Sequence, residues 1–369
     1  MFAFKLGRVG AAESTAMTER TPLAGWLRNA PAILLLAVAA GVAVRGVLLS
    51  LPPLFITDVY FYNAQAPAYL LGGVDPYGAS YSVPLQLATS GAGTVFAYLP
   101  GVFAFLVPGS LGAGARLGLV ACDLVVAGAL VAAGRSRGWL MAAVFLLLPP
   151  IALFSTSFLN DSLPAVAFLS VAVALEAKGR HVPAGVLLGL ALASSQEAWF
   201  VVPVYLAYSA RRHSFRGAAA ALVSAVAVVA PFAAWNFSAF VEDTLLFQFQ
   251  RGAVPLLSAG PFGLNVNPSL QGILLSAGAG LPVLARGGVT AALLAFVVWR
   301  ARPTLGYLLW GSSLAVAGSL FLLAGDFFWS YLELPFVLGL FWAGLSLGFG
   351  PERSTTLKEP EAGVASPAK

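Results

Sequence analysis

The sequence predicts an all-α protein that crosses a membrane many times, and two observations carry this prediction. Hydrophobic residues make up 59% of the 369 positions and charged residues only 9%, whereas a soluble globular domain carries about 25% charged residues. In addition, apolar segments alternate with short polar or basic loops along most of the chain. We therefore expect one transmembrane domain over residues 30–350, between a cytoplasmic N-terminal segment, 1–29, and a disordered cytoplasmic tail, 351–369.

The apolar segments do not all have the length of a membrane span. They lie at 30–51, 96–112, 117–134, 139–155, 163–177, 182–209, 217–235, 281–299, 304–323 and 330–349. The first is too long for the core of a signal peptide and is typical of a spanning helix. Several others are shorter than the ~20 residues that a straight span needs. We therefore infer the side of the membrane on which each loop lies from the positions of the lysine and arginine residues.

Charge decides whether segment 96–112 spans the membrane. With the basic N-terminus inside, a spanning 96–112 would place most later basic loops outside. If 96–112 is instead a short helix in the outer leaflet, 16 of the 20 lysines and arginines lie on the cytoplasmic side, as the positive-inside rule requires. Pro100 and Pro108 also favour a short, broken helix. We expect the second arrangement.

Segment 182–209 is predicted to be a hairpin that enters and leaves on one side. Both of its flanks are basic, 178–181 and 211–213, and a single helix would separate them. Two arms that meet at Ser194–Glu197 keep the flanks together, and at ~1.5 Å per residue each arm reaches only about 20 Å. The predicted topology has about ten passes, both termini in the cytoplasm, and external segments at 52–116 and 236–280.

Several classes of function are excluded by what the sequence lacks. The single cysteine, Cys122, allows no disulfide, Cys-based metal site or Cys/His dyad within the chain. Both histidines fall in basic loops, so a His-rich metal site is not expected, and dependence on a divalent metal is left open. There is no phosphate-binding loop for ATP-driven transport. The formal charge of +5 comes from topology-determining loops and does not indicate a nucleic-acid partner.

Acidic and amide side chains collect in the segments predicted to be external. They are Asp58, Asp75, Asn160, Asp161, Gln196, Glu197, Glu242, Asp243 and Asp326. Asp58, a few residues beyond the first apolar helix, is either a helix cap or part of a site, and the same two readings hold for Asp161. Glu197, at the hairpin apex beside Trp199, is harder to explain as a solvated surface residue.

Two charged residues fall inside apolar segments. Asp123 needs a partner within the membrane, either Arg116 or Arg45, and we favour a structural hydrogen bond between helices over a catalytic role. Arg45 can extend to the headgroups, or its planar guanidinium can bind a lipid phosphate. Aromatic residues crowd the first external segment, as an interfacial belt or a sugar-stacking surface would: Tyr60, Phe61, Tyr62, Tyr69, Tyr77, Tyr81, Phe96 and Tyr98.

The order of these features resembles the GT-C superfamily of integral membrane glycosyltransferases. The closest likeness is to glycosyltransferase family 87 and the related polyprenyl-phosphate-mannose-dependent mannosyltransferases. The likeness is carried by Arg45, Asp58-x-Tyr60-x-Tyr62, Gly72-Gly73-x-Asp75-Pro76-Tyr77, Tyr98-Leu99-Pro100, Pro108, Asp123, Asn160-Asp161, Gly185 to Gly189 and Trp329-x-Tyr331-x-x-x-Pro335. It covers most of the chain and is strongest over 45–108.

The resemblance implies transfer of a hexose, with mannose as the first choice, from a polyprenyl-phosphate donor to a glycan, lipid or protein acceptor. The reaction would take place on the extracytoplasmic side of the cell membrane. Asp58 would act as general base, and Arg45 would stabilise the leaving phosphate. The implied substrate-binding residues are Arg45, Tyr60, Tyr62, Asp75, Tyr77, Tyr98, Asp161, Gln196 and Glu197. No cofactor beyond the donor is implied.

Two departures from the GT-C pattern leave alternatives open. Many relatives carry a second acid where this chain has Tyr60, which weakens the case for a metal. Relatives often have a basic residue where this chain has Gln196 and Glu197, which leaves phosphate binding there open, and Arg251 or Arg286 could take this role instead. The alternatives are a transporter or flippase, and a catalytically inactive GT-C-like scaffold. A transporter is expected to have repeated halves and polar residues at mid-membrane, whereas the polar residues here favour one face.

Overall fold

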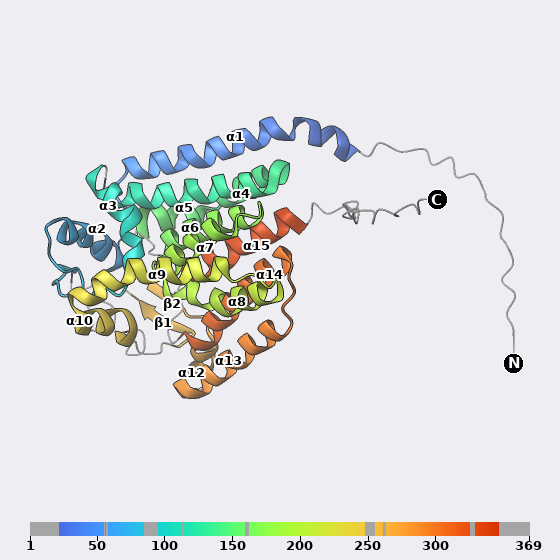
Figure 1. Ribbon diagram of the computed structural model, residues 1–369. Coiled ribbons are helices and arrows are strands. Elements are labelled where there is room, and N and C mark those ends of the chain that lie inside the picture. Colours follow the sequence, from blue (N-terminus) through green and yellow to red (C-terminus); the bar gives the residue numbers. More distant parts are fainter. Residues whose placement is uncertain are drawn as a thin grey trace, which may run out of the picture.

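The computed structural model describes residues 22–54, 56, 58–84, 95–112, 114–158, 162–247, 255–260, 263–324 and 329–346. Helices dominate this part of the chain, as the sequence predicts, and a two-stranded hairpin is added to them (Figure 1). Four helices are long and apolar enough to cross a membrane, and a fifth span results if one pair bent by 62° counts as one. Of the residues singled out above, Asn160, Asp161, Arg251 and Asp326 lie outside the described ranges.

The elements follow one another as a series of helices interrupted once by β-structure. They are α1 (Pro22–Ser50), α2 (Asp58–Leu71), η2 (Pro100–Val102), α3 (Phe103–Leu111), α4 (Ala115–Leu147), α5 (Pro149–Leu153), η3 (Phe154–Phe158), α6 (Ser162–Glu176), α7 (His181–Leu192), η4 (Gln196–Val201), α8 (Val202–Arg211), α9 (Arg216–Trp235), α10 (Phe237–Val241), η5 (Glu242–Leu246), β1 (Leu257–Gly260), β2 (Gly263–Val266), α12 (Leu270–Ser276), α13 (Val283–Trp299), α14 (Leu305–Leu323), η6 (Trp329–Leu332) and α15 (Glu333–Ser346). The strands are antiparallel, with Leu257 opposite Val266.

The chain reverses direction within α4. A Cβ atom built on Gly138 would lie 2.3 Å from the carbonyl oxygen of Leu130, although eight residues of straight helix span about 12 Å. The guanidinium of Arg116, near the start of α4, also donates to the carbonyl of Thr156 in η3. Residues 115–134 and 137–157 are therefore antiparallel neighbours, which matches the separate apolar segments at 117–134 and 139–155.

The predicted hairpin over 182–209 is present. His181 begins α7 and Arg212 follows α8, and their Nε2 and Nη2 atoms lie 3.3 Å apart. Both also contact the same carboxylate oxygen of Glu176, at the end of α6, at 2.9 and 3.2 Å. The two basic flanks therefore share one end of the bundle, as expected from charge.

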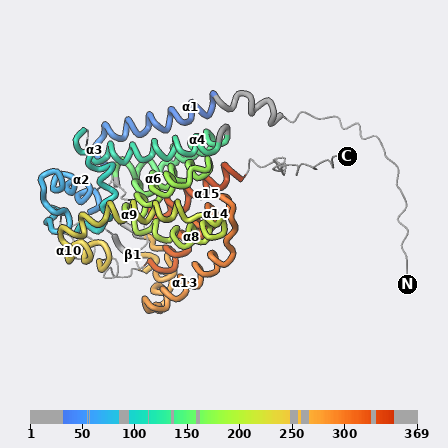
Figure 2. Tube along the Cα trace, viewed as in Figure 1, coloured from blue at the N-terminus to red at the C-terminus, as the bar shows by residue number. Residues whose placement is uncertain are grey.

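The segment 96–112 is also short in the structure, with helical residues only from Pro100 to Leu111. It packs closely on the start of α4, because a Cβ built on Gly118 would lie 2.1 Å from the carbonyl oxygen of Phe105. α1 runs beside α4 along the edge of the bundle in both ribbon and tube views (Figures 1 and 2).

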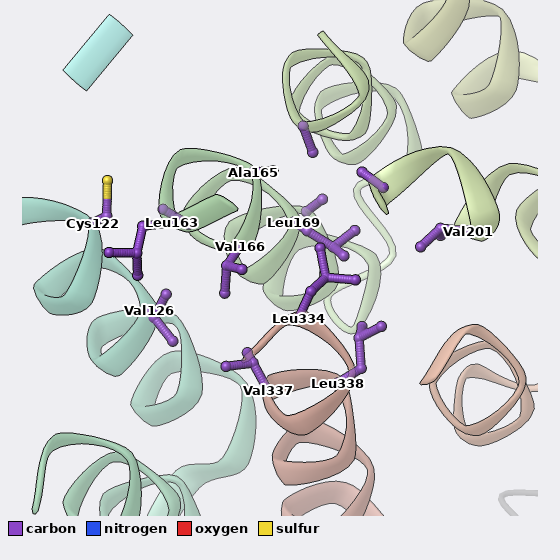
Figure 3. Close-up of a cluster of buried hydrophobic side chains, with 14 of the residues drawn as sticks. Cys122, Val126, Leu163, Ala165, Val166, Leu169, Val201, Leu334, Val337 and Leu338 are labelled. Carbon is purple, nitrogen blue, oxygen red and sulfur yellow. The ribbon is translucent and has the colours of Figure 1, made fainter. Parts of the chain in front are cut away.

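The apolar core lies where α4, α6 and α15 meet (Figure 3). Val126 of α4, Leu163 and Val166 of α6, and Leu334 and Val337 of α15 are all buried there. Such side chains interdigitate without leaving room for water, which holds the three helices together. The helices that carry the candidate site are arranged around this core.

Candidate functional site

The bundle has a basic end and an acidic end. α9 connects them: it begins at Arg216, close to the basic flanks of the hairpin, and ends at Trp235. The next residue, Asn236, lies beside the Asp75 turn, because a Cβ on Gly78 would be 3.0 Å from the carboxylate of Asp75 and 3.2 Å from the side-chain amide of Asn236. A helix of about 20 residues is about 30 Å long, which is also the thickness of the hydrocarbon core of a membrane.

Asp58 is the first residue of α2 and is half-buried. Its Oδ1 accepts a hydrogen bond from the backbone N–H of Val59 at 2.9 Å. A carboxylate in the first turn of a helix also interacts favourably with the positive end of the helix dipole. This bond involves the next residue in the chain and occupies one oxygen of the carboxylate, and the side chain is still partly accessible for chemistry.

The aromatic residues of the first external segment pack mostly against one another. Tyr81 contacts Tyr62 and Tyr69 edge to face, with ring centroids 5.4 and 5.3 Å apart, and stacks on Phe96 at 6.0 Å. The rings of Tyr62, Tyr77, Tyr81 and Phe96 are buried. In this conformation Tyr62 and Tyr77 lie beneath the surface and support the site, while Tyr60 is half-buried.

The Asp75 turn is fixed by hydrogen bonds of its own. Asp75 accepts from the backbone N–H groups of Tyr77 and Gly78 at 3.0 and 3.1 Å, a pattern typical of aspartate in turns. The hydroxyl of Tyr77 donates to the carbonyl of Tyr98 at 2.8 Å. These bonds connect the loop after α2 to the loop before η2, so Asp75, Tyr77 and Tyr98 form one unit.

Asp243, one of the acids in the second predicted external segment, is buried. It is 5% exposed, and its Oδ2 accepts from the N–H of Phe96 at 3.3 Å. Burial raises the pKa of Asp243 to about 7; the Phe96 N–H opposes this shift, and the nearby acids Glu242 and Asp75 add to it. A carboxyl group with a pKa near neutrality can both accept and donate a proton at physiological pH.

Burial also raises the pKa values of Tyr77 and Tyr81, and the negative charges of Asp243 and Asp75 contribute. Both tyrosines therefore stay protonated and remain hydrogen-bond donors. The adjacency of Glu242 and Asp243 directly after an apolar helix was the signal in the sequence that could have identified this acid.

The hairpin apex forms part of the same assembly. The side-chain amide of Gln196 donates to the carbonyls of Ala97 and Thr244, both at 3.0 Å, and so joins the loop before η2 to η5. Glu197 is buried and accepts from the hydroxyl of Ser162 at 2.9 Å. The structure thus brings together Asp75, Tyr77, Tyr98, Gln196 and Asp243, while Glu197 lies beside the start of α6.

Arg45 is not at the surface of this site. Its side chain is fully buried, and Nε donates to Asp123 Oδ2 at 2.6 Å. Nη1 donates to the carbonyls of Gly41 and Leu146 at 3.1 and 2.7 Å. The guanidinium expected to bind a lipid phosphate therefore binds a carboxylate, and Asp123 forms the helix-to-helix bond favoured from the sequence.

The other basic candidates bind the carbonyl ends of helices. Arg116 donates to the carbonyls of Leu48 and Leu51, at the end of α1. Arg286 is nearly buried and donates to the carbonyl of Leu323, the last residue of α14, at 2.6 Å. Cationic side chains stabilise helix C-termini in this way, so both residues have a structural explanation.

Within the ranges that the structure describes, no three His, Cys, Asp or Glu side chains are grouped as they would be to hold a metal ion. Comparison of the chain with protein-family models, with curated proteins and with solved structures finds no significant match in any of the three.

Proposed function

We propose that this chain is an integral membrane glycosyltransferase of the GT-C type. It transfers a hexose, with mannose as the first choice, from a polyprenyl-phosphate donor to a glycan, lipid or protein acceptor. The observation that supports this proposal is that Asp75, Asp243 and the hairpin apex meet at the end of the bundle where the loops are long. Acids and aromatic residues at one end suit an enzyme that works at one face of a membrane.

The proposed topology has about ten passes, with both termini in the cytoplasm and the acidic end outside. Two features support it. The basic flanks of α7 and α8 meet at Glu176, and the antiparallel halves of α4 place one further basic loop, around Arg137, at a turn. Positively charged loops on one side are typical of the cytoplasmic face.

The proposed reaction is a displacement at the anomeric carbon of the donor sugar. The acceptor hydroxyl forms the new glycosidic bond while the bond to the polyprenyl phosphate breaks, so the phosphate leaves with the electron pair as a stable anion. The acceptor proton passes to a carboxylate. Asp58 is the first candidate for this base because it is partly accessible, and Asp243 is the second because its pKa of about 7 suits proton transfer.

The decisive experiment measures transfer of radiolabelled mannose from polyprenyl-phosphate-mannose to acceptors in membranes that contain the full chain. Asp58→Asn keeps the shape of the side chain and removes the base, so we expect a loss of at least about 100-fold. Asp243→Asn is measured in parallel. Glu242→Gln is the matched control, because Glu242 neighbours Asp243 but is exposed, and it should retain transfer.

The outcomes of this assay identify the base and test the proposed function. Full transfer by Asp58→Asn together with loss in Asp243→Asn would move the base to Asp243. Full transfer by both variants would rule out a base at either acid. Absence of transfer by the wild type from mannose, glucose and arabinose donors alike would overturn the proposed function in favour of a transporter or an inactive scaffold.

A further inference from the structure

A cavity of about 380 Å³ opens between the α13–α14 loop and the end of α15. This loop lies at the basic end of the bundle. The first part of α14 packs against α8, because a Cβ built on Gly311 of α14 would lie 3.1 Å from Val204 of α8. Helix α8 ends seven residues after Val204, at Arg211 of the basic end. The cavity is therefore remote from the acidic end and independent of the sugar-transfer chemistry proposed there.

Two arginines give the cavity its charge. Arg300 and Arg302 both line it, both are exposed, and the guanidinium carbon of Arg300 lies 5.9 Å from the ring centroid of Trp299. None of the lining residues identified in the described part of the chain is acidic. Guanidinium groups offer a planar pair of donors that matches the oxygens of a phosphate, so the charge favours a phosphate-bearing ligand.

Large aromatic side chains line the rest of the cavity. Trp310 and Trp342 are each 42% exposed, and Phe296 is 49% exposed. Tyr307 also lines the cavity, with its ring centroid 5.8 Å from that of Trp310. Tryptophan and tyrosine are favoured where a membrane protein meets the headgroup region, because one part of the side chain is apolar and another is polar. The site thus presents a polar and an apolar portion side by side.

The absence of a side chain at Gly306 keeps the cavity open. A Cβ built there would have only the hydroxyl of Ser346 within contact range, at 4.0 Å. Gly306 lies in the first turn of α14, where a leucine is compatible with helix. A larger side chain at this position would fill the cavity without removing either arginine.

We propose that this cavity binds an anionic phospholipid. The headgroup phosphate binds Arg300 and Arg302, and the acyl chains lie along Trp310 and Trp342. The combination of adjacent arginines with exposed tryptophans at the end of membrane-type helices matches an amphiphile with a negative headgroup. Basic pockets between helices at a membrane surface bind anionic lipid headgroups in the same manner.

The test is native mass spectrometry of the full chain in detergent, titrated with phosphatidylglycerol or with phosphatidylcholine of identical acyl chains. We expect the wild type to bind phosphatidylglycerol roughly tenfold more tightly or better, because each arginine near the surface contributes. The variant Arg300→Gln/Arg302→Gln should lose this preference. Gly306→Leu should lose bound lipid although both arginines remain.

The matched control is Arg211→Gln/Arg216→Gln, which removes two exposed arginines from the same end of the bundle and should keep the preference. Equal loss in this control would show a general charge effect and overturn the proposal, as would an unchanged preference in the Arg300/Arg302 variant. A parallel titration in millimolar phosphate, against sodium chloride of equal ionic strength, separates the two sources of phosphate. Displacement by phosphate alone would assign the cavity to a soluble anion. A thermal unfolding curve for each variant confirms that it is folded.

Discussion

Arg45 Nε and Asp123 Oδ2 lie 2.6 Å apart between α1 and α4, and both side chains are 0% exposed. Two buried charges are tolerated here only as a pair, because the desolvation free energy of each charge is offset by its attraction to the other. The guanidinium also donates to the carbonyl of Leu146, which adds a second bond between α1 and α4, and to the carbonyl of Gly41 within α1 itself. This pair fixes the position of α1 against the bundle.

Removing one partner of this pair should be more damaging than removing both. Arg45→Gln or Asp123→Asn leaves a buried charge unpaired and should lower the free energy of unfolding by about 3–5 kcal/mol. The double variant Arg45→Met/Asp123→Leu should lie much closer to the wild type. Denaturant unfolding in detergent measures all three, and additive losses in the double variant would contradict the pairing.

The contact between α7 and α9 should tolerate no side chain at Gly185 or Gly189. A Cβ at Gly185 would lie 2.0 Å from the carbonyl of Gly217, and one at Gly189 would lie 2.3 Å from that of Ala221. Small residues four apart let membrane helices approach closely. Gly189→Leu should therefore cost about 1–3 kcal/mol, seen as a lower unfolding midpoint. The control is Gly128→Leu, because nothing lies within 4 Å of a Cβ there, and it should be close to neutral.

Asp243 should make the stability of the protein depend on pH. Its pKa is raised from 3.8 to about 7 in the folded chain, so between these values the folded state binds more protons than the unfolded state. The free energy of unfolding must then fall as the pH rises through this window, by on the order of 4 kcal/mol. Unfolding measured at several pH values should show a smaller decline for Asp243→Asn. An identical decline in that variant would assign it to other groups.

The proposed topology predicts which positions a membrane-impermeant thiol reagent reaches. The native Cys122 is buried and should give little background. Ser80→Cys, in the exposed part of the loop after α2, should react in intact cells. Arg211→Cys, at the basic end, should react only after the membrane is permeabilised. Labelling of both positions in intact cells, or the reverse pattern, would rule out the proposed orientation.

The positions of charged residues in the sequence predicted two features of the fold, the hairpin over 182–209 and a partner for Asp123. The basic flanks of segment 182–209 indicated that both ends share one side, and the contact between His181 and Arg212 confirms it. Asp123 required a partner, and Arg45 was one of two possible residues. Both predictions succeed because a charge in an apolar setting leaves few physical solutions.

Other features depend on tertiary contacts that no local pattern encodes. Tyr62 and Tyr77, which the resemblance implies contact a substrate, are buried, and their rings pack against Tyr81 and Phe96. Asp243 acquires its raised pKa from burial and from neighbours far along the chain. The hairpin of β1 and β2 was not expected either, because its four-residue strands are too short to show a clear alternation of apolar and polar residues.

The buried pair of Arg45 and Asp123 also constrains how the chain is assembled during synthesis. The two residues are separated by 78 positions, so at 5–20 residues per second Asp123 is made roughly 4–16 seconds after Arg45. During that interval α1 carries a lone positive charge that cannot settle stably among lipid tails. In the proposed membrane topology we therefore expect the first helix to wait at the insertion machinery, or to tilt its arginine toward the headgroups, until the first half of α4 arrives to neutralise it.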